Sequence, residues 1–218
     1  LARTELESMS LAGASGSVTA EGITAGLMTV SAGSGDIALR NCAVAEVTGE
    51  ALMVTSGSGE ITLEQITVAR GVIHTASGDI ALRNCTVTGV SVEALEVTSG
   101  SGDITLEQIS AGSGRVYSAS GGVTMKDSLA TSLTLRADSG GIQLEDVELT
   151  QSLLTTSSGD ITLDRVAAET LNLSTVSGDV RGTLLSNLRY AVQTQSGSVD
   201  GPPDAPEGGL CQVSTVSG

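Results

Sequence analysis

Apolar and polar residues alternate along most of the chain, in short runs that follow Ser-Gly pairs. Within each run the apolar residues have a period of two, which is typical of strands that bury one face. In ten of these runs an Ile or Val stands two residues after the Gly of the pair, and we take it as the anchor of a repeat. The anchors are Val18, Ile37, Ile61, Ile80, Ile104, Val123, Ile142, Ile161, Val180 and Val199, at spacings of 19 or, twice, 24 residues. Such regularity indicates an internal repeat.

Further apolar columns appear when the repeats are aligned on the anchor. The column two residues after the anchor contains Leu39, Leu63, Leu82, Leu106, Met125, Leu144 and Leu163. The column five residues after it contains Ile23, Cys42, Ile66, Cys85, Ile109, Ser128, Val147, Val166 and Leu185. The column seven residues before it contains Leu11, Val30, Val54, Ile73, Val97, Val116, Leu135, Leu154, Leu173, Val192 and Val213. A looser column nine before the anchor contains Met28, Leu52, Leu95, Leu133, Leu171 and Tyr190, interrupted by Gly71, Gly114 and Ser152. Parity shifts between these columns mark corners, so we expect three short strands in each repeat.

The repeat predicts an all-β fold, a single-stranded parallel β-helix (solenoid) in which each repeat forms one coil. Nineteen residues are too few for a helical crossover between parallel strands, and the buried columns recur at the same offsets. Identical columns then stack as ladders about 4.8 Å apart, so about ten coils make a rod roughly 50 Å long. We expect right-handed winding from the general chirality of parallel connections. Residues 1–218 are interpreted as a single domain.

One glycine column marks a corner of the coil. The Gly of the Ser-Gly pair recurs at the same offset in every repeat, as in Gly16, Gly35 and Gly159. The sequence predicts that this column adopts a positive φ, which a Cβ would penalise.

Insertions and a proline-rich segment interrupt the regular coils. The two spacings of 24 residues each add five residues between the second and third strands, around 45–49 and 88–92, and we expect both to protrude from the same edge of the rod. Residues 34–66 and 77–109 agree at 26 of 33 positions, which indicates an internal duplication of two coils. All three prolines fall within 201–209, which predicts a loop before the pattern resumes at Cys211, Val213 and Thr215.

The composition agrees with a narrow aliphatic core. The chain has no Phe or Trp and only two Tyr, yet 39% of it is hydrophobic and its mean hydropathy is +0.21. Coils filled by stacked Ile, Val and Leu leave little room for larger rings. The formal charge of −15 argues against nucleic-acid binding, because an acidic surface repels phosphates. No apolar run approaches the length of a membrane span, and we expect any signal or anchor to lie outside this segment.

The motif Ser-Gly-Asp-Ile-Thr-Leu at 158–163, with a fuller form at 171–180, resembles the bacterial adhesin family of β-strand repeat proteins, whose function is unknown. The resemblance covers essentially the whole chain. It implies a bacterial protein that is extracellular or anchored at the cell envelope by a segment outside the repeats. It brings no catalytic residues with it.

Charged residues stand three residues after the anchor, and the first seven of them alternate in sign. The column consists of Glu21, Arg40, Glu64, Arg83, Glu107, Lys126, Glu145 and Asp164. Stacking places each basic residue between two acids, so we expect cross-strand ion pairs that contribute about 0.2–1 kcal/mol each. Such a ladder sets the register of the coils and argues against a catalytic role for these residues.

Acidic residues also precede the anchor in six coils: Asp36, Glu60, Asp79, Asp103, Asp160 and Asp179. Stacked carboxylates about 5 Å apart repel one another unless a cation bridges them, so a calcium ladder is one hypothesis. The alternative is that the carboxylates accept hydrogen bonds from turn amides at an exposed corner. Gly122 and Gly141 interrupt the column, which favours the alternative.

The cysteines, the histidine and the tyrosines predict little chemistry. Cys42 and Cys85 share an inward column two coils apart, roughly 9–10 Å and beyond disulfide reach. With Cys211 in another column, we expect three buried free thiols and no metal site, because ligand spacing and histidines are lacking. His74, the one histidine, and Tyr117 should point outward.

Three functions remain as hypotheses. The first is a non-enzymatic structural or binding module of the bacterial surface, without catalytic, cofactor or metal residues, whose ligand is a protein or polysaccharide. The second, a polysaccharide-active enzyme, needs a polar cluster from neighbouring coils. Its candidate residues are Arg115, Lys126, Asp127, Arg136, Asp138 and Asp146. The third is a scaffold that associates end to end through the unpaired strand edges of the rod.

Overall fold

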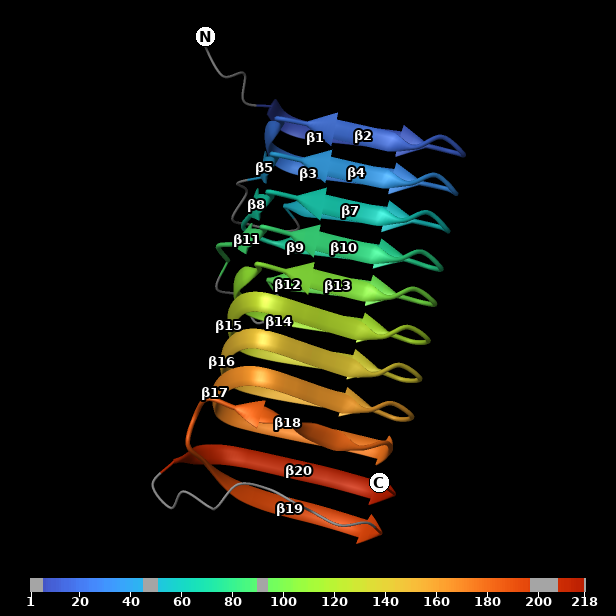
Figure 1. Cartoon of the computed structure of the whole chain (residues 1–218). Helices are drawn as coiled ribbons and strands as arrows, with labels where there is room; N and C mark the ends of the chain where they lie inside the picture. Colours follow the sequence, from blue (N-terminus) through green and yellow to red (C-terminus); the bar gives the residue numbers. More distant parts are fainter. Residues whose placement is uncertain (1–5, 45–50, 90–93, 197–207, 218) are drawn as a thin grey trace.

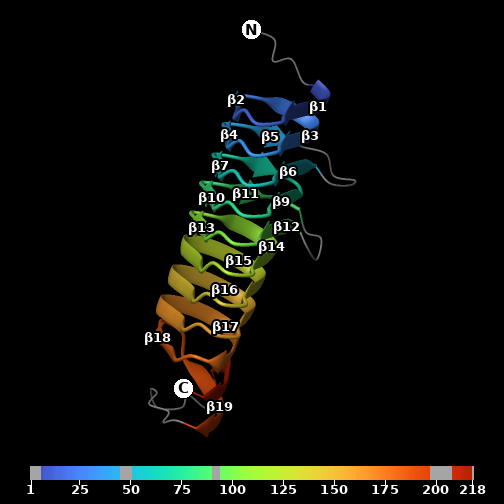
Figure 2. The ribbon, with the colours of Figure 1, turned by 90° about the vertical axis from the view of Figure 1, so that its right-hand side faces the viewer.

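The computed structural model contains the predicted solenoid. The structure describes residues 6–44, 51–89, 94–196 and 208–217, and within these ranges the chain forms twenty strands of one sheet and no helix. All strand pairs are parallel, and the coils stack one on another into a rod (Figure 1, Figure 2). The predicted fold class is therefore confirmed.

Each coil has three faces, as the columns predict. The anchor face consists of β2 (Val18–Glu21), β4 (Ile37–Arg40), β7 (Ile61–Glu64), β10 (Ile80–Arg83) and β13 (Ile104–Glu107). The short face consists of β5 (Ala43–Val44), β8 (Thr67–Val68) and β11 (Thr86–Val87), and the return face of β6 (Leu52–Ser56), β9 (Gly71–Thr75) and β12 (Leu95–Ser99). Three longer strands, β1 (Leu6–Gly13), β3 (Thr24–Ala32) and β14 (Ser110–Ser118), follow both the short and the return face.

Coils without insertions have the longest strands. β15 (Val123–Ala137), β16 (Ile142–Thr156) and β17 (Ile161–Ser177) each continue around all three faces. In this region most residues of one coil have a partner at the same offset in the next, and pairing resumes in the same register after each corner. The three separate short strands that we predicted therefore occur only in the coils near the five-residue insertions.

Aliphatic ladders fill the interior of the rod. Ile61 pairs in register with Ile37 on one side and Ile80 on the other, and all three side chains are fully buried. The column seven before the anchor is equally buried, from Val30 to Leu154. Burying each such side chain contributes on the order of 1.5–3 kcal/mol, so the core requires no aromatic ring.

The Ser-Gly corner contains glycine for a different reason from the one predicted. Positive φ occurs among the described glycines only at Gly22 and Gly182, outside this column, so that prediction is wrong. A Cβ added at Gly159 would lie 2.2 Å from the carbonyl oxygen of Gly140 in the preceding coil. The close approach of successive backbones therefore excludes a side chain. At Gly16, in the first coil, no atom lies within 4 Å of an added Cβ.

Positive φ belongs instead to the corner between the anchor face and the short face. The residues there are Gly22, Asn41, Gln65, Asn84, Gln108, Asp127, Asp146 and Arg165, with φ between 48° and 69°. Gly, Asn and Asp tolerate this left-handed conformation best. One left-handed residue reverses the alternation of the chain, which explains why residues two and five after the anchor both point inward.

The C-terminal end departs from serial stacking. β18 (Val180–Leu184) pairs with β17 on the anchor face, but on the return face β20 (Gly209–Ser217) lies between β17 and β19 (Leu188–Ser196), as Figure 1 shows. The pattern does resume in the predicted register, since Cys211 pairs with Leu171. Serial stacking of the repeats would place this strand after β19 along the rod, and the structure instead places it between β17 and β19.

Two other predictions concern residues at or beyond the ends of the described ranges. Leu185, predicted to be buried, is 67% exposed, because the described strands do not close a complete coil over it. The insertions fall mainly on 45–50 and 90–93 and the proline-rich loop mainly on 201–207, outside the described residues. Gly209, which we placed in that loop, already begins β20.

Candidate functional site

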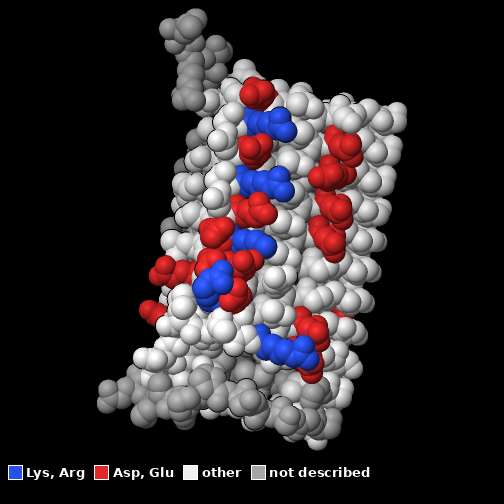
Figure 3. All heavy atoms as spheres, in the orientation of Figure 1, with Lys and Arg blue, Asp and Glu red and all other residues white. Residues whose placement is uncertain are grey.

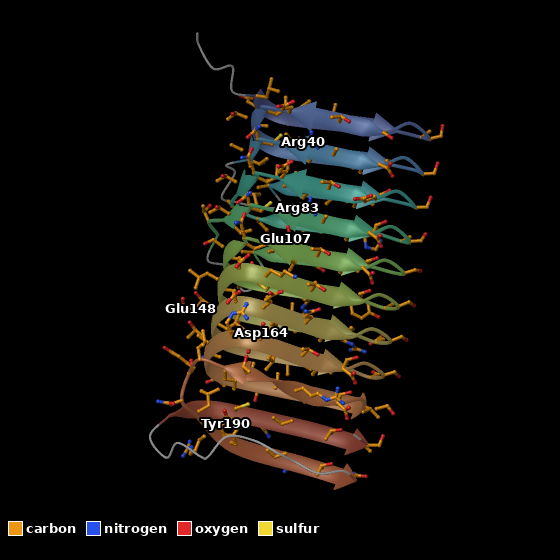
Figure 4. All side chains as sticks on the ribbon, in the orientation of Figure 1. Arg40, Arg83, Glu107, Glu148, Asp164 and Tyr190 are labelled. Carbon is orange, nitrogen blue, oxygen red and sulfur yellow. The ribbon has the colours of Figure 1, made fainter. Side chains whose placement is uncertain are left out.

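The predicted charge ladder lies along the anchor face. Arg40 contacts Glu64 at 3.3 Å, Arg83 contacts Glu107 at 3.0 Å, and Lys126 contacts Glu145 at 2.8 Å. Figure 3 shows the alternating column of basic and acidic side chains, and Figure 4 shows Arg40, Arg83 and Glu107 in one line. These side chains join neighbouring coils, as predicted.

The acidic column beside the Ser-Gly corner is also bonded from coil to coil. The Asp79 carboxylate accepts the backbone N–H of Asp103 at 2.8 Å, and Asp103 accepts that of Gly122 at 2.8 Å. Asp36 and Asp160 accept the corresponding N–H groups of the next coils. The amide hypothesis is therefore confirmed, with the amide supplied by the next coil and not by the same turn. Within the described ranges, no group of three or more metal-ligating side chains is present.

The candidates Lys126, Asp127 and Asp146 lie along one edge of the anchor face. Lys126 belongs to the ladder, and its pKa is raised by the hydrogen bond with Glu145. Asp127 and Asp146 occupy the left-handed corner column, where Asn stands in other coils, so they continue the repeat and do not break it. Arg165, in the same column, donates from Nε and Nη2 to the two oxygens of Asp146 at 2.6 and 2.5 Å, which lowers the pKa of Asp146.

The candidates Arg136 and Asp138 form a separate cluster with Tyr117 on the return face. The Tyr117 hydroxyl donates to one Asp138 oxygen at 2.7 Å, and Arg136 Nε donates to the other at 2.9 Å. The Arg136 guanidinium lies 5.6 Å from the centre of the Tyr117 ring, within cation–π distance. The hydroxyl of Tyr117 and then Arg136 lower the pKa of Asp138, and the same hydroxyl bond raises the pKa of Tyr117. Both Asp138 oxygens are thus engaged, which makes this carboxylate a poor general base.

Arg115 and His74 share the return face with this cluster. Arg115 pairs in register with Thr134, in the column next to the Tyr117–Arg136 pair. His74 lies in the column of Tyr117, two coils toward the N-terminus, and is exposed as predicted. The six enzyme candidates therefore divide between two faces of the rod, where they do not converge on one point.

All three cysteines are buried free thiols, as predicted. Cys42 and Cys85 donate to the carbonyl oxygens of Arg40 and Arg83 at 3.2 and 3.3 Å. Burial raises the pKa of Cys85, and it raises the pKa of Cys211 to about 11. Buried protonated thiols are poor nucleophiles, so these residues serve packing.

Sequence reasoning missed a column of buried hydroxyls five residues before the anchor. Its members are Ser56, Thr75, Ser99, Ser118, Thr156 and Thr175. Ser99 Oγ accepts the N–H of Gly102 at 2.8 Å and donates to the carbonyl oxygen of Gly78 in the preceding coil at 3.0 Å. The sequence could have revealed this column, because Ser or Thr recurs three residues before the corner glycine.

The described part of the chain contains no helix long and apolar enough to cross a membrane. Comparison with known proteins gives one positive result: the model of the family described as Toastrack DUF4097 matches residues 1–96 and 88–208. No curated protein and no solved structure matches the chain. The match supports the predicted kinship with a repeat family of unknown function but does not carry the adhesin description. Because the two matches together extend over residues 1–208, the chain belongs to the Toastrack DUF4097 family.

Proposed function

We propose that this chain is a non-enzymatic scaffold or binding module displayed at a bacterial surface. The observation that carries the proposal is the use of the chemically active side chains in contacts between coils. Lys126 binds Glu145, Asp146 binds Arg165, and both oxygens of Asp138 are engaged. Hydrolysis of a glycosidic bond typically uses a pair of carboxyl groups that converge on one bond. The candidate residues instead stiffen the rod.

The Tyr117–Arg136–Asp138 cluster is the proposed contact surface for a protein or polysaccharide ligand. An aromatic side chain and an arginine held in fixed positions supply contact area and charge with little loss of conformational entropy. Elsewhere on this face the outward columns contain Thr98, Thr155 and Ser174, which offer small polar contacts beside the cluster.

A binding assay with isolated bacterial envelope polysaccharides and envelope proteins tests this function. We expect binding that weakens at least about tenfold in Tyr117→Ala, which corresponds to about 1.4 kcal/mol. His74→Ala is the matched control, because it changes an exposed ring in the same column without touching the cluster. Equal binding by both variants would place the ligand elsewhere on the rod. Polysaccharide cleavage that disappears in Asp127→Ala would overturn the non-enzymatic assignment.

End-to-end assembly is a second candidate function, favoured by the N-terminal end of the rod. Among the described strands, β1 pairs only with β3 and β2 only with β4, so each has one edge that pairs with no other described strand. Open parallel edges are templates for another chain. Light scattering over a range of concentrations should detect growing assemblies, and a constant mass of 21.7 kDa would exclude this candidate.

A further inference from the structure

The last strand of the chain occupies an internal position in the sheet. On the return face Cys211 of β20 pairs with Leu171 of β17 on one side and with Tyr190 of β19 on the other. The next inward rows are Leu173–Val213–Val192 and Thr175–Thr215–Thr194. β20 is therefore held by two parallel ladders, whereas β19, which precedes it in the chain, has one described neighbour.

β19 and β20 fit the same slot beneath β17. Tyr190 follows Leu171 by the usual 19 residues, so serial stacking would place β19 where β20 lies. Both strands bring a valine to the column seven before the anchor and a threonine to the column five before it. These two inward columns therefore do not distinguish the strands, which differ in the next inward row, where β19 has Tyr190 and β20 has Cys211.

The connection is long because the two strands are parallel. Leu188 pairs with Gly209 and Ser196 with Ser217, so the chain must return along the whole strand, about 26 Å. The twelve residues 197–208 can span about 40 Å when extended, which is sufficient. If two copies instead meet through their β19 edges about a twofold axis, their strands run antiparallel. The C-terminal end of one copy's β19 then lies beside the N-terminal end of the other copy's β19. To bring β20 into the slot of the other copy, the connection must cross only two strand spacings, about 10 Å.

We propose that two copies of this chain exchange β20, so that the β20 of each copy occupies the slot between β17 and β19 of the other. The interface is isologous, and each slot keeps both of its parallel ladders. Exchange keeps the inward side chains of β20 in the core. A twofold axis normal to the return-face sheet does not turn the sheet over, so the same face of each strand points inward in both copies. This inference is independent of the ligand-binding function proposed above.

Shortening the connection tests the exchange. Deleting residues 202–207 leaves six residues, which reach about 20–22 Å when extended and are too short for the return of about 26 Å within one chain. We expect the shortened chain to be a stable dimer, with a mass by light scattering of about twice that of its own single chain. The matched control replaces 202–207 with six Gly and Ser residues, which keeps the length and should keep the parent distribution. A folded shortened chain that remains monomeric would overturn the proposal.

Disulfide trapping tests the exchange in the full-length chain, even if the shortened chain does not fold. Cys42→Val and Cys85→Val first remove the other thiols, with Val as found in the same column at Val147. A chain with Tyr190→Cys and Cys211→Ala is then mixed and refolded with a chain that keeps Cys211. Because Tyr190 and Cys211 are direct neighbours on adjacent strands, exchange should yield a disulfide-linked dimer on oxidation.

Two further chains control this experiment. Leu95→Cys, in the same inward column of the middle coils, replaces Tyr190→Cys and should give no cross-linked dimer. A single chain that carries Tyr190→Cys together with Cys211 verifies that the geometry permits the bond. If that bond forms within one chain while the mixed chains give no dimer, β20 is not exchanged and the proposal is wrong.

Discussion

The middle coils and the C-terminal end of this rod use one repeat but differ in how a strand obtains its neighbours. Between β4 and β17, each strand pairs with its equivalents in the adjacent coils, and the corner backbones approach so closely that Gly159 can carry no Cβ. At the end, Gly182 stands in the column that holds leucine elsewhere, Leu185 is exposed, and the pairing of β17 with β18 shifts register between Leu163 and Val166.

The difference shows that the repeated side-chain columns determine the register in which two strands pair, whereas a short connection determines which strand comes next along the rod. Columns of matching side chains align any strand of the repeat with any other, as the pairing of Leu171 with Cys211 shows. In the middle coils, corners of a few residues allow each strand to reach only the next level. Where 197–208 connects the last two strands, that restriction is absent, and β20 takes an earlier level.

Truncating the core should produce the largest contrast between the two regions. Leu144 is fully buried in the middle coils, whereas Leu184 at the end is only partly buried. Leu144→Ala should lower the free energy of unfolding by about 2–5 kcal/mol because it leaves a cavity. We expect less than about 1.5 kcal/mol for Leu184→Ala, since its surroundings can collapse. Urea unfolding measures both, and equal losses would remove the contrast.

The corner glycines should separate the interior of the stack from its first coil. Gly159→Ala places a Cβ 2.2 Å from the carbonyl oxygen of Gly140, and we expect a loss of about 1–3 kcal/mol or more. Gly16→Ala makes the same change where no atom lies within 4 Å and should cost less than about 0.5 kcal/mol. A large loss at Gly16 would show that conformational preference, and not close approach, selects this glycine.

Buried hydroxyls should stabilise the corners of the middle coils. Ser99→Ala leaves the N–H of Gly102 and the carbonyl of Gly78 without this partner and should cost about 1–3 kcal/mol. Ala137 occupies the same column without a hydroxyl, so Ala137→Ser should increase the free energy of unfolding by about 1 kcal/mol. Thermal unfolding of the two variants checks the pair. Effects of the same sign would show that the hydroxyl is not the stabilising group.

Surface clusters should contribute least, and their contribution depends on pH. The pKa of Asp138 is lowered from 3.8 in the folded chain, so its stabilising effect is present above about pH 4 and is lost as pH falls through the folded value. Asp138→Asn should therefore flatten the acid limb of the stability profile between pH 2 and pH 4. Tyr117→Phe removes the hydroxyl that donates to Asp138 and should flatten the acid limb in part. An unchanged profile in both variants would contradict the assigned hydrogen bonds.

Much of the candidate site was predictable because it consists of repeated columns. Stacking at constant offset brings Arg83 beside Glu107 whatever the details of the corners. The cluster of Tyr117 with Asp138 was not predictable, because it depends on how one side chain leans across to the next coil. Asp127 and Asp146, named as enzyme candidates, belong to the left-handed corner column, which is defined by backbone conformation and not by one residue type.

The sequence by itself determined the coil, its buried columns and the register of its charges, because these follow from a period that is written along the chain. Only the tertiary structure decided why glycine is required at the Ser-Gly corner and which corner is left-handed, since both depend on the distance and direction between successive backbones. It also decided the place of β20. The inward Val and Thr of β19 and β20 fit the same columns at either level, so the columns alone do not decide which of the two strands lies beside β17.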